Sequence, residues 1–460
     1  MNLNNCQILV VGFGITGVPL VDFLHKKGAS VTLNDAKKRN ELQEALKHIE
    51  NYNVRTVLGG HPLDLSLYGN PEMIIVSPGV PVDLPFLQAF RKKGIPVIGE
   101  IELAFRFMKA PVVAITGTNG KTTTTALTGE IFRLGGKSPE VVGNIGIPAI
   151  SKAEALGSDQ FYVMEVSSFQ LETIELFRPK AAALLNITPD HLNRHGSMEA
   201  YASLKYRIFE NQQEDDVSVI NADDAACMTY REQLKSRKCF FSRFNKLPEG
   251  VFIEHEEMIA RWNDAEKHLI HIGKIGIPGS HNLENAMAAA ALAITSGVSE
   301  EAVREGLETF KGVAHRIEHV ATIDGVDYVN DSKATNPDAA IKAVEAVEAP
   351  IILLAGGMDK KNDFTALIKT FEDKVKWLYV YGETAAQLIE TAHSVGFQKI
   401  SNVSDLEEAV MSAASISRSG DTVLLSPACA SWDMYTSFEE RGNHFKSLVS
   451  KIQKDRLMYQ

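Results

Sequence analysis

The sequence is poor in cysteine and has no long hydrophobic run. Four cysteines occur among 460 residues, and they form no CxxC pair: Cys6, Cys227, Cys239 and Cys429. This pattern indicates reduced thiols, not disulfides or zinc ligands, and favours a cytoplasmic protein. No apolar run approaches the length that crosses a bilayer, and residues 1–5 lack the basic region of a signal peptide. We therefore expect no membrane insertion.

Positive charge is also scarce, because 47 Lys and Arg face 58 Asp and Glu, for a net charge of −11. This balance argues against broad binding to nucleic acid or to an anionic membrane. Any phosphate recognition must therefore come from local loops and single lysines. The hydrophobic content of 45% is that of an ordinary globular protein, and the chain is too long for one compact core.

Short apolar runs alternate with helical patterns in three blocks, which predicts an α/β fold with mostly parallel sheets. We expect three domains, at residues 1–99, 100–312 and 313–460. The expected strands of the first block are 7–12, 30–35, 53–58, 73–77 and 96–98. The second block has apolar runs at 161–166 and 181–187 and an alanine-rich helix at 282–293, and the third has strands at 326–330, 351–355, 377–381 and 422–425. Ligands of such sheets bind at the carboxyl ends of the strands.

The most informative stretch is residues 117–123, GTNGKTT, directly after the apolar run 111–116. A strand, a glycine turn and a helix start would point backbone N–H groups at one spot, which is a ready anion site. Lys121 would neutralise phosphate charge, and a threonine hydroxyl could hold Mg²⁺. The stretch departs from the strict GxxxxGK[ST] pattern, because Ile115 stands at the first glycine. The alternative is a structural turn with a chance lysine.

A second glycine-rich turn, GFGITG at residues 12–17, follows the first expected strand, and Asp35 ends the second one. Alone this resembles a dinucleotide fingerprint, although any nucleotide diphosphate site on this fold could use it. It could also serve only helix–sheet packing. SPG at residues 77–79 would face the same crevice. Two glycine loops of different kinds suggest two different nucleotides in one active site.

The central block carries further polar residues at expected strand ends. Glu165 follows a buried strand, where a magnesium ligand or a structural carboxylate with a cationic partner would stand. The pair Asp190-His191 ends the next strand, where a ligand or a packed histidine is equally expected. From the residues alone, Lys205 on the following helix is a surface lysine. Asn282 and Asn285 share a helix face, where they could contact an adenine or ribose, or cap and pack.

Three polar loops end strands of the third block: 330–337 (NDSKATNP), 356–360 (GGMDK) and 426–431 (SPACAS). Their mixture of acid, hydroxyl, lysine and amide groups before helix starts is more typical of a ligand site than of plain caps. Because these loops belong to one sheet edge, we expect a pocket that binds a carboxylate.

Taken together, these motifs resemble the Mur ligases of peptidoglycan synthesis. The similar stretches, in order, are GTNGKT, MEVSSFQLE, DH, LKYRIFE, HNLEN, HR, NDSKATN and LSPACAS. Within the family, GFGITG, SPG, GGMDK and SPACASWDMYTSFEERG are similar to the branch that adds D-glutamate to UDP-N-acetylmuramoyl-L-alanine. The match spans the whole chain. Folylpolyglutamate synthases share the central block but are not expected to share the NDSKATN and SPACAS loops.

The resemblance implies a Rossmann-like N-terminal domain for the UDP-sugar, a central P-loop-type ATPase domain and a Rossmann-like C-terminal domain for the amino acid. It also implies an ATP-dependent amide ligase. ATP would phosphorylate the L-alanine carboxylate, and the amine of D-glutamate would attack the acyl phosphate. Joining a carboxylate to an amine is unfavourable in water, so activation by phosphoryl transfer is required.

The resemblance also implies roles for individual residues. The ATP contacts would be Thr118, Asn119, Gly120, Lys121, Thr122, Thr123, Thr124, Asn282, Arg316 and Asp331. The catalytic residues would be Lys121, Glu165, His191 and Lys205, and two Mg²⁺ ions would be held by Thr122, Glu165, His191 and Lys205, the last as a carbamate formed with carbon dioxide. The UDP-sugar contacts would be Ile15, Thr16, Asp35, Lys37, Gly79, Asn144 and His191, and the D-glutamate contacts Thr335, Lys360, Ser431 and Phe438. Lys37 stands where the family often has an arginine. Lysine keeps the positive charge but lacks the bidentate fork of the arginine guanidinium.

Three alternatives stay open. A nicotinamide-dependent oxidoreductase would explain GFGITG and Asp35 but not GTNGKTT or the third block. A non-catalytic nucleotide-binding regulator would use ATP only as a switch. Another Mur-type or folylpolyglutamate-type amide ligase differs only in its acceptor. For the favoured enzyme we expect a cytoplasmic monomer whose partners are small molecules.

Overall fold

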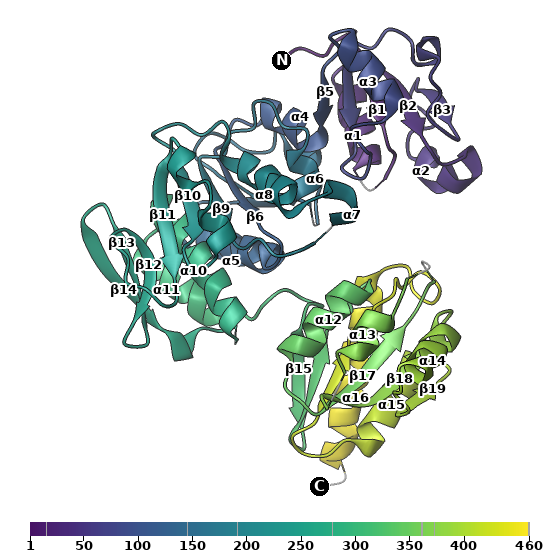
Figure 1. Ribbon diagram of the computed structural model, residues 1–460, viewed down its shortest axis with the longest axis vertical. Coiled ribbons are helices and arrows are strands. Elements are labelled where there is room, and N and C mark those ends of the chain that lie inside the picture. The colour runs from purple at the N-terminus through teal and green to yellow at the C-terminus, as the bar shows by residue number, and fades with distance from the viewer. Residues whose placement is uncertain are drawn as a thin grey trace. The chain divides into compact units, whose positions relative to one another are not determined.

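The computed structural model describes residues 1–14, 16–144, 146–190, 192–277, 279–359, 362–371 and 373–458. The chain divides into two compact units, Met1–Phe310 and Lys311–Gln460 (Figure 1). The first unit holds two sheets and the second holds one. In the described part of the chain, no helix is both long and apolar enough to cross a membrane.

The first sheet of unit 1 is parallel, with strand order β3-β2-β1-β4-β5. Its strands are β1 Gln7–Val11, β2 Ser30–Asp35, β3 Arg55–Leu58, β4 Met73–Val76 and β5 Val97–Gly99. Its helices are α1 Gly17–Lys26, α2 Gln43–Lys47 and α3 Pro85–Lys92, with 3₁₀ turns η1 Arg39–Leu42 and η2 Leu65–Tyr68. The middle strands are buried on both faces, which explains why they are continuous apolar runs in the sequence.

The second sheet of unit 1 has the order β14-β13-β12-β11-β10-β9-β6-β8-β7. Its strands are β6 Val112–Thr116, β7 Glu140–Gly143, β8 Tyr162–Glu165, β9 Ala181–Leu184, β10 Val217–Asn221, β11 Arg237–Ser242, β12 Gly250–Glu254, β13 Glu257–Trp262 and β14 Ala265–His271. Strands β12, β13 and β14 form an antiparallel meander, and the other pairs are parallel.

Helices and 3₁₀ turns surround this central sheet. They are α4 Glu100–Phe107, α5 Lys121–Leu134, η3 Ala149–Lys152, α6 Ser168–Leu171, α7 Leu192–His195, α8 Met198–Tyr206, η4 Arg207–Phe209, α9 Ala225–Met228, η5 Arg231–Gln233, η6 Ile272–Lys274, α10 Ser280–Thr295 and α11 Glu300–Thr309. The alanine-rich middle of α10 is fully buried, so the helix packs closely against α5 and the sheet.

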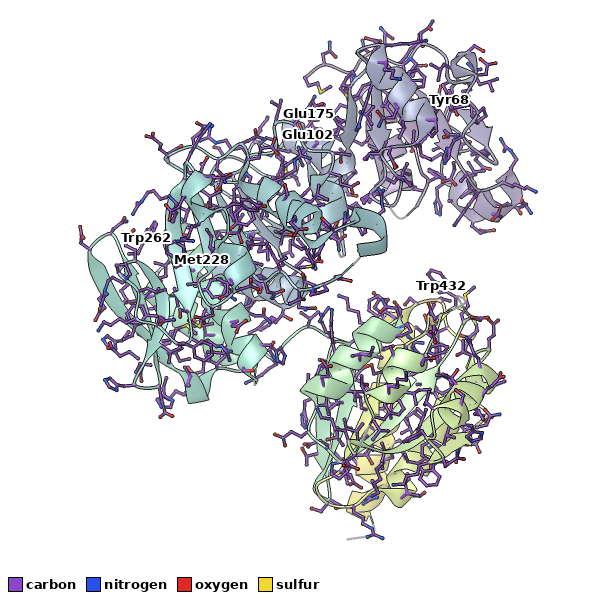
Figure 2. The ribbon with its side chains drawn as sticks, in the orientation of Figure 1. Tyr68, Glu102, Glu175, Met228, Trp262 and Trp432 are labelled. Carbon is purple, nitrogen blue, oxygen red and sulfur yellow. The ribbon has the colours of Figure 1, made fainter. Side chains whose placement is uncertain are left out.

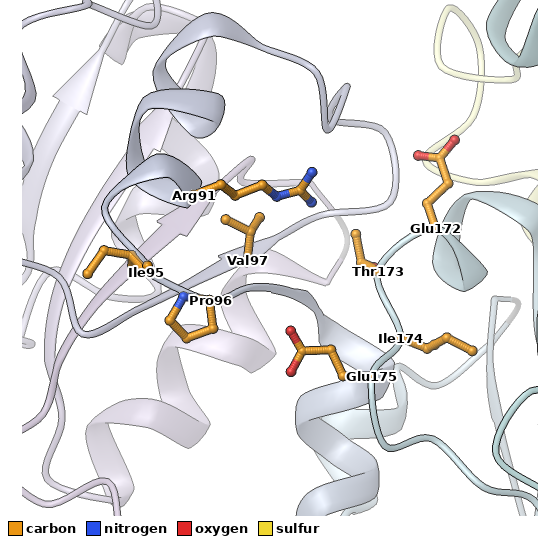
Figure 3. A pocket seen from close by; sticks show the side chains of 9 residues that line it. Arg91, Ile95, Pro96, Val97, Glu172, Thr173, Ile174 and Glu175 are labelled. Atoms are coloured by element: carbon orange, nitrogen blue, oxygen red, sulfur yellow. The ribbon is translucent and has the colours of Figure 1, made fainter.

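A buried carboxylate ties α4, which follows β5, to the segment that precedes β9. Glu102 on α4 accepts the backbone N–H groups of Glu175, Leu176 and Phe177 at 2.9–3.1 Å and pairs with Arg106 at 2.8 Å (Figure 2). Beside this joint lies a cleft of about 460 Å³ between the α3–β5 segment and residues 172–175 (Figure 3). None of the predicted site residues lines this cleft.

Unit 2 contains a sheet with the order β15-β16-β20-β17-β18-β19, parallel except for the β15–β16 hairpin. Its strands are β15 Glu318–Ile323, β16 Val326–Asn330, β17 Ile351–Gly356, β18 Val375–Tyr381, β19 Ile400–Asn402 and β20 Thr422–Leu425. Its helices are α12 Pro337–Ala346, α13 Thr365–Lys369, α14 Ala385–Ser394, α15 Leu406–Ile416 and α16 Phe438–Met458.

The predicted α/β class is confirmed, and the predicted strands of all three blocks lie within two residues of the observed ones at nearly every end. The strand count of the third block was wrong, because β15 precedes the strand that was taken as the first and β19 was also missed. Both are edge strands whose side chains are largely half-buried or exposed, so they lack the apolar run that marks a central strand.

Candidate active site

The predicted phosphate loop lies between β6 and α5, at the carboxyl edge of the central sheet. Gly117 and Gly120 have φ values of 156° and 82°, which only glycine adopts readily. A Cβ on Gly120 would stand 2.1 Å from Oδ1 of Asn285. Helix α5 begins directly at Lys121, so its N-terminus faces the loop. The loop thus has the strand–turn–helix geometry of an anion site.

The loop is anchored to the segment after β9. The Thr118 N–H donates to the Asn186 carbonyl at 2.9 Å, and the Asn119 N–H donates to Asn186 Oδ1 at 2.8 Å. The Thr118 hydroxyl lies 3.2 Å from the Tyr201 hydroxyl, and it accepts the Thr188 N–H at 3.1 Å. Sequence reasoning did not single out Asn186 or Tyr201. Asn186 follows the neighbouring strand β9 and Tyr201 lies on α8, so only the fold brings them to the loop.

Two lysines converge on one carbonyl of this loop. Lys121 Nζ donates to the carbonyl oxygens of Gly117 and Thr118, each at 2.9 Å. Lys205 Nζ, from α8, donates to the same Gly117 oxygen at 2.8 Å and lies 4.6 Å from the centre of the Tyr201 ring. The structure therefore brings both predicted catalytic lysines to the phosphate loop.

Lys205 corrects one expectation drawn from the residues alone. It is not a surface lysine, because its exposed fraction is 1%. Burial, together with the nearby charge of Lys121, holds the pKa of the Lys205 amine well below its usual range. The sequence around it gives little sign of this, since the burial depends on the loop that covers the side chain.

Glu165 lies at the end of β8, as predicted, and is 2% exposed. Its Oε1 accepts the side-chain amide of Asn144 at 3.1 Å, and its backbone carbonyl accepts the Asn144 N–H at 2.9 Å. The Asn144 residue is itself exposed. A predicted UDP-sugar contact and a predicted metal ligand are thus direct neighbours.

The two asparagines at the start of α10 share a face, as expected. Asn285 Nδ2 donates to Asn282 Oδ1 at 3.2 Å, and the Thr124 hydroxyl donates to Asn285 Oδ1 at 3.3 Å. Asn285 therefore connects the phosphate loop with Asn282, which was predicted to contact ATP.

The glycine loops of the first sheet also meet. The Ser77 hydroxyl donates to the Gly12 carbonyl at 2.9 Å, and Gly12 has a φ of 91°. Asp35 accepts the N–H groups of Phe13 at 2.6 Å and Lys37 at 2.7 Å, so its carboxylate ties the first glycine loop to the turn after β2.

The remaining predicted UDP-sugar residues on this side are less buried. Thr16 precedes α1 and makes no side-chain cap hydrogen bond, while Lys37 and Gly79 are exposed or partly exposed. Ile15 lies outside the described residues, as do His191 and Lys360. The structure therefore says nothing about these three predicted site residues.

In unit 2, Asp331 and Arg316 lie close to one another in the fold. Asp331 is 4% exposed, and it accepts the Ile317 N–H at 3.2 Å and the Ser426 hydroxyl at 2.8 Å. Burial raises the pKa of the Asp331 carboxyl to about 7. Arg316 stands between His315 and Ile317, whose φ values of 64° and 42° are unusual for residues other than glycine. Such backbone geometry is typical of functional loops.

A buried arginine joins the loop after β16 to the loop after β20, and one predicted D-glutamate residue, Phe438, is linked to it through Ser332. Arg441, 1% exposed, donates to the Ser332 hydroxyl at 3.0 Å and to the Ser332 and Cys429 carbonyls at 2.9 and 3.1 Å. Ser332 in turn donates to the Phe438 carbonyl, and Lys333 Nζ lies 5.9 Å from the Phe438 ring. Ser431 is buried and Thr335 is partly buried. The sequence did not single out Arg441.

Comparison with known proteins identifies the class to which this arrangement belongs. Three family models match in order: the MurD-like N-terminal domain of Mur ligases at residues 6–99, the Mur ligase middle domain at 115–293, and the Mur ligase glutamate ligase domain at 315–429. The chain therefore belongs to the Mur ligase family. Its N-terminal sheet matches the MurD-like branch.

Relatives extend the similarity over the full length. The chain is 51% identical over 454 residues to the UDP-N-acetylmuramoylalanine–D-glutamate ligase of Alkaliphilus metalliredigens, covering 99% of this chain and 100% of that protein. It is 46% identical to the ligase of the same name from Clostridioides difficile, covering 98% and 100%. Among solved structures, MurF of Thermotoga maritima in complex with ADP has a TM-score of 0.55 at 17% identity, with 99% and 96% covered, and supports the fold alone.

Proposed function

We infer that the chain is an ATP-dependent amide ligase that joins D-glutamate to UDP-N-acetylmuramoyl-L-alanine in peptidoglycan precursor synthesis. The observation that carries this inference is the identity of about half of all residues, over the whole chain, to ligases named for that reaction. The oxidoreductase and regulator alternatives leave the central and C-terminal family matches unexplained. A ligase for another acceptor differs in the amino acid that it would use.

In the proposed reaction, a carboxylate oxygen of the L-alanine group attacks the γ-phosphorus of ATP, and the bond to the β-phosphate oxygen breaks to release ADP. The D-glutamate amine then attacks the acyl carbon, loses a proton, and expels inorganic phosphate with the C–O bond pair. Lys121 would stabilise the charge that develops on the transferred phosphoryl group. Its present bonds to the loop carbonyls hold it at the helix N-terminus where that charge would lie.

The residues present fit a requirement for Mg²⁺, which would neutralise charge on the ATP phosphates. Thr122 and Glu165 offer the oxygen ligands that this ion prefers. Among the described residues, however, no cluster of three or more His, Cys, Asp or Glu side chains could hold a metal. We propose that Lys205 supplies a further anionic ligand as a carbamate, together with His191 of the same sequence motif.

The state of Lys205 supports this proposal, because only a neutral amine reacts with carbon dioxide. Burial and the charge of Lys121 lower the pKa of the Lys205 amine and so favour its neutral form. The nitrogen lone pair would bond to the carbon of CO₂, one C=O pair would move to oxygen, and the nitrogen would lose a proton. We expect a carbamate carbon signal in ¹³C NMR after equilibration with labelled bicarbonate, absent from Lys205→Arg. A fully active wild-type protein without that signal would contradict the modification.

The other predicted contacts are proposed on the same basis. Thr118 to Thr124, with Asn282 and, from unit 2, Arg316 and Asp331, would contact ATP. The UDP-sugar would contact Ile15, Thr16, Asp35, Lys37, Gly79, Asn144 and His191, and D-glutamate would contact Thr335, Lys360, Ser431 and Phe438. Three functional domains divided near residues 99 and 312, a monomeric state and a cytoplasmic location complete the proposal.

Phosphate release from ATP by the purified chain tests the function directly. It is measured with UDP-N-acetylmuramoyl-L-alanine and D-glutamate, with L-glutamate in its place, and without an amino acid. We expect release only when the sugar nucleotide and D-glutamate are both present. Release with L-glutamate would change the acceptor, and release that needs neither substrate would favour a regulator or simple ATPase.

A further inference from the structure

A second buried glutamate has no part in the reaction as derived above. Glu100 begins α4, and its exposed fraction is 2%. Its Oε1 accepts the Ile150 N–H at 2.7 Å, whereas its Oε2 is buried and has no hydrogen-bond partner among the described residues. Burial raises the pKa of this carboxyl to about 7. Such a side chain costs stability, so a purely structural role explains it poorly.

Glu102, on the same helix, shows what a structural carboxylate looks like at this place. It is also buried, but it accepts three backbone N–H groups and pairs with Arg106. Within the described part of the chain, Glu100 accepts only one backbone N–H, that of Ile150, which lies in the 3₁₀ turn η3 after the β7 loop. The two glutamates are therefore similarly buried, but they differ in the number of hydrogen bonds and ion pairs that their carboxylates make.

The loop that Glu100 holds carries Asn144. At its other end the Gly143 N–H donates to the Ile147 carbonyl at 2.9 Å, and Asn144 bonds to both the backbone and the side chain of Glu165. Gly143 has a φ of 121°, and a Cβ there would lie 2.2 Å from the Glu165 carbonyl oxygen. The loop is thus tied to Glu165 at its start and to Glu100 at its end.

We propose that Glu100 is a positioning residue for the ligase reaction: by holding Ile150, it fixes the loop that places Asn144 against the UDP-sugar and against Glu165. This inference rests on the proposed function. It predicts that loss of the acceptor at Glu100 impairs use of the sugar nucleotide and leaves use of the amino acid unchanged. A residue that served only the stability of α4 would not discriminate between the two substrates.

The test compares Glu100→Ala with Glu100→Gln in the full chain. Loss of one buried hydrogen bond in Glu100→Ala raises KM for UDP-N-acetylmuramoyl-L-alanine about fivefold, with KM for D-glutamate within about twofold. Glu100→Gln keeps an acceptor oxygen, so it restores the sugar-nucleotide KM. Should Glu100→Ala fail to fold, Glu100→Met removes the acceptor at similar length. Calorimetric titration of the sugar nucleotide gives the same comparison without turnover.

Glu102→Gln is the matched control, and it lowers the melting temperature without changing the ratio of the two KM values. In an Asn144→Ala background, Glu100→Ala adds less than about twofold, because the contact through which it acts is already lost. Equal changes in both KM values, or additive effects with Asn144→Ala, would overturn the positioning role. A wild-type chain that releases no phosphate with both substrates would instead overturn the proposed function, and the inference with it.

Discussion

The carboxyl edges of the central and C-terminal sheets each bury a basic side chain, but burial affects the protonation of the two side chains differently. At the central edge, Lys205 donates to the Gly117 carbonyl, and burial lowers the pKa of its amine. At the C-terminal edge, Arg441 donates to the Ser332 and Cys429 carbonyls. Burial lowers the pKa of the Arg441 guanidinium as well, yet arginine stays protonated in proteins. The same desolvation therefore prepares a reactive amine in one place and a permanent charge in the other.

The C-terminal edge adds a buried acid that has the opposite response. Burial pushes Asp331 toward its protonated form and raises the pKa of its carboxyl to about 7, whereas burial pushes Lys205 toward its deprotonated form. Groups that change charge easily are suited to chemistry or to ligand-dependent charging. Arg441, by contrast, is suited to holding the Ser332 and Cys429 segments together.

The largest expected effect tests the neutral state of Asp331. Its pKa is 3.8 in the unfolded chain and about 7 when folded, so the native state holds an extra proton between these values. Stability should therefore fall as pH rises from about 4 to about 7, by at most on the order of 4 kcal/mol, and change little above. Urea denaturation of Asp331→Asn should show a flatter pH dependence than the wild type. The control is Asp327→Asn, half exposed on the preceding strand β16, which should keep the wild-type slope.

The next largest effect concerns the positive charge of Lys121 at the edge of the central sheet. Lys121→Ala should lower kcat about 10²–10³-fold or more, equivalent to about 2.7–4 kcal/mol of transition-state stabilisation. Steady-state phosphate release measures this, and Lys109→Ala, at an exposed position, should leave kcat unchanged. An unchanged turnover in Lys121→Ala would remove the phosphate-loop assignment.

Exchanging lysine for arginine at position 205 tests the difference between the two buried cations directly. Lys205→Arg places a cation that cannot lose its proton where a neutral amine is proposed, and activity should fall at least about 100-fold because no carbamate forms. The exposed Lys235→Arg is its control. A Lys205→Arg enzyme with near-normal activity would show that a charge, not a reactive amine, is what this position needs.

The reciprocal exchange, of arginine for lysine at position 441, should have the smallest effect of the four, and the effect should be on stability. Arg441→Lys loses the planar fork that reaches Ser332 and Cys429 together, so the free energy of unfolding should fall by about 1–3 kcal/mol. Arg456→Lys, on the same helix and 40% exposed at its side chain, should change it little. Chemical denaturation of the full chain measures both, and equal losses in the two variants would deny Arg441 its structural role.

Much of the fold could be predicted because parallel strands buried on both faces are continuous apolar runs. Strands β2, β16 and β20 coincide with their predicted ranges. Strands β7, β10 and β11, the meander β12–β14 and the edge strands β15 and β19 were not predicted, because their sequences mix polar with apolar residues. Secondary structure at a sheet edge depends on its neighbour more than on its own pattern.

The sequence motifs of the candidate site could be predicted, but the burial and the tertiary contacts of its side chains could not. The glycine turn, Lys121, Glu165 at a strand end and the shared face of Asn282 and Asn285 all follow from local spacing. Lys205 was misjudged as a surface residue from its own helix, and Asn186, Tyr201 and Arg441 were not singled out. Their roles depend on segments that no local pattern connects.

The sequence by itself determined the order of motifs, the central strands and the family, because each depends on neighbouring residues along the chain. Only the tertiary structure decided the charge states. Gly117 and Lys205 are 88 positions apart, and Asp331 and Ser426 are 95 apart, yet each pair shares a hydrogen bond in the buried interior. Desolvation and the partner across such a contact set the pKa of the side chain, and neither exists before the chain has folded.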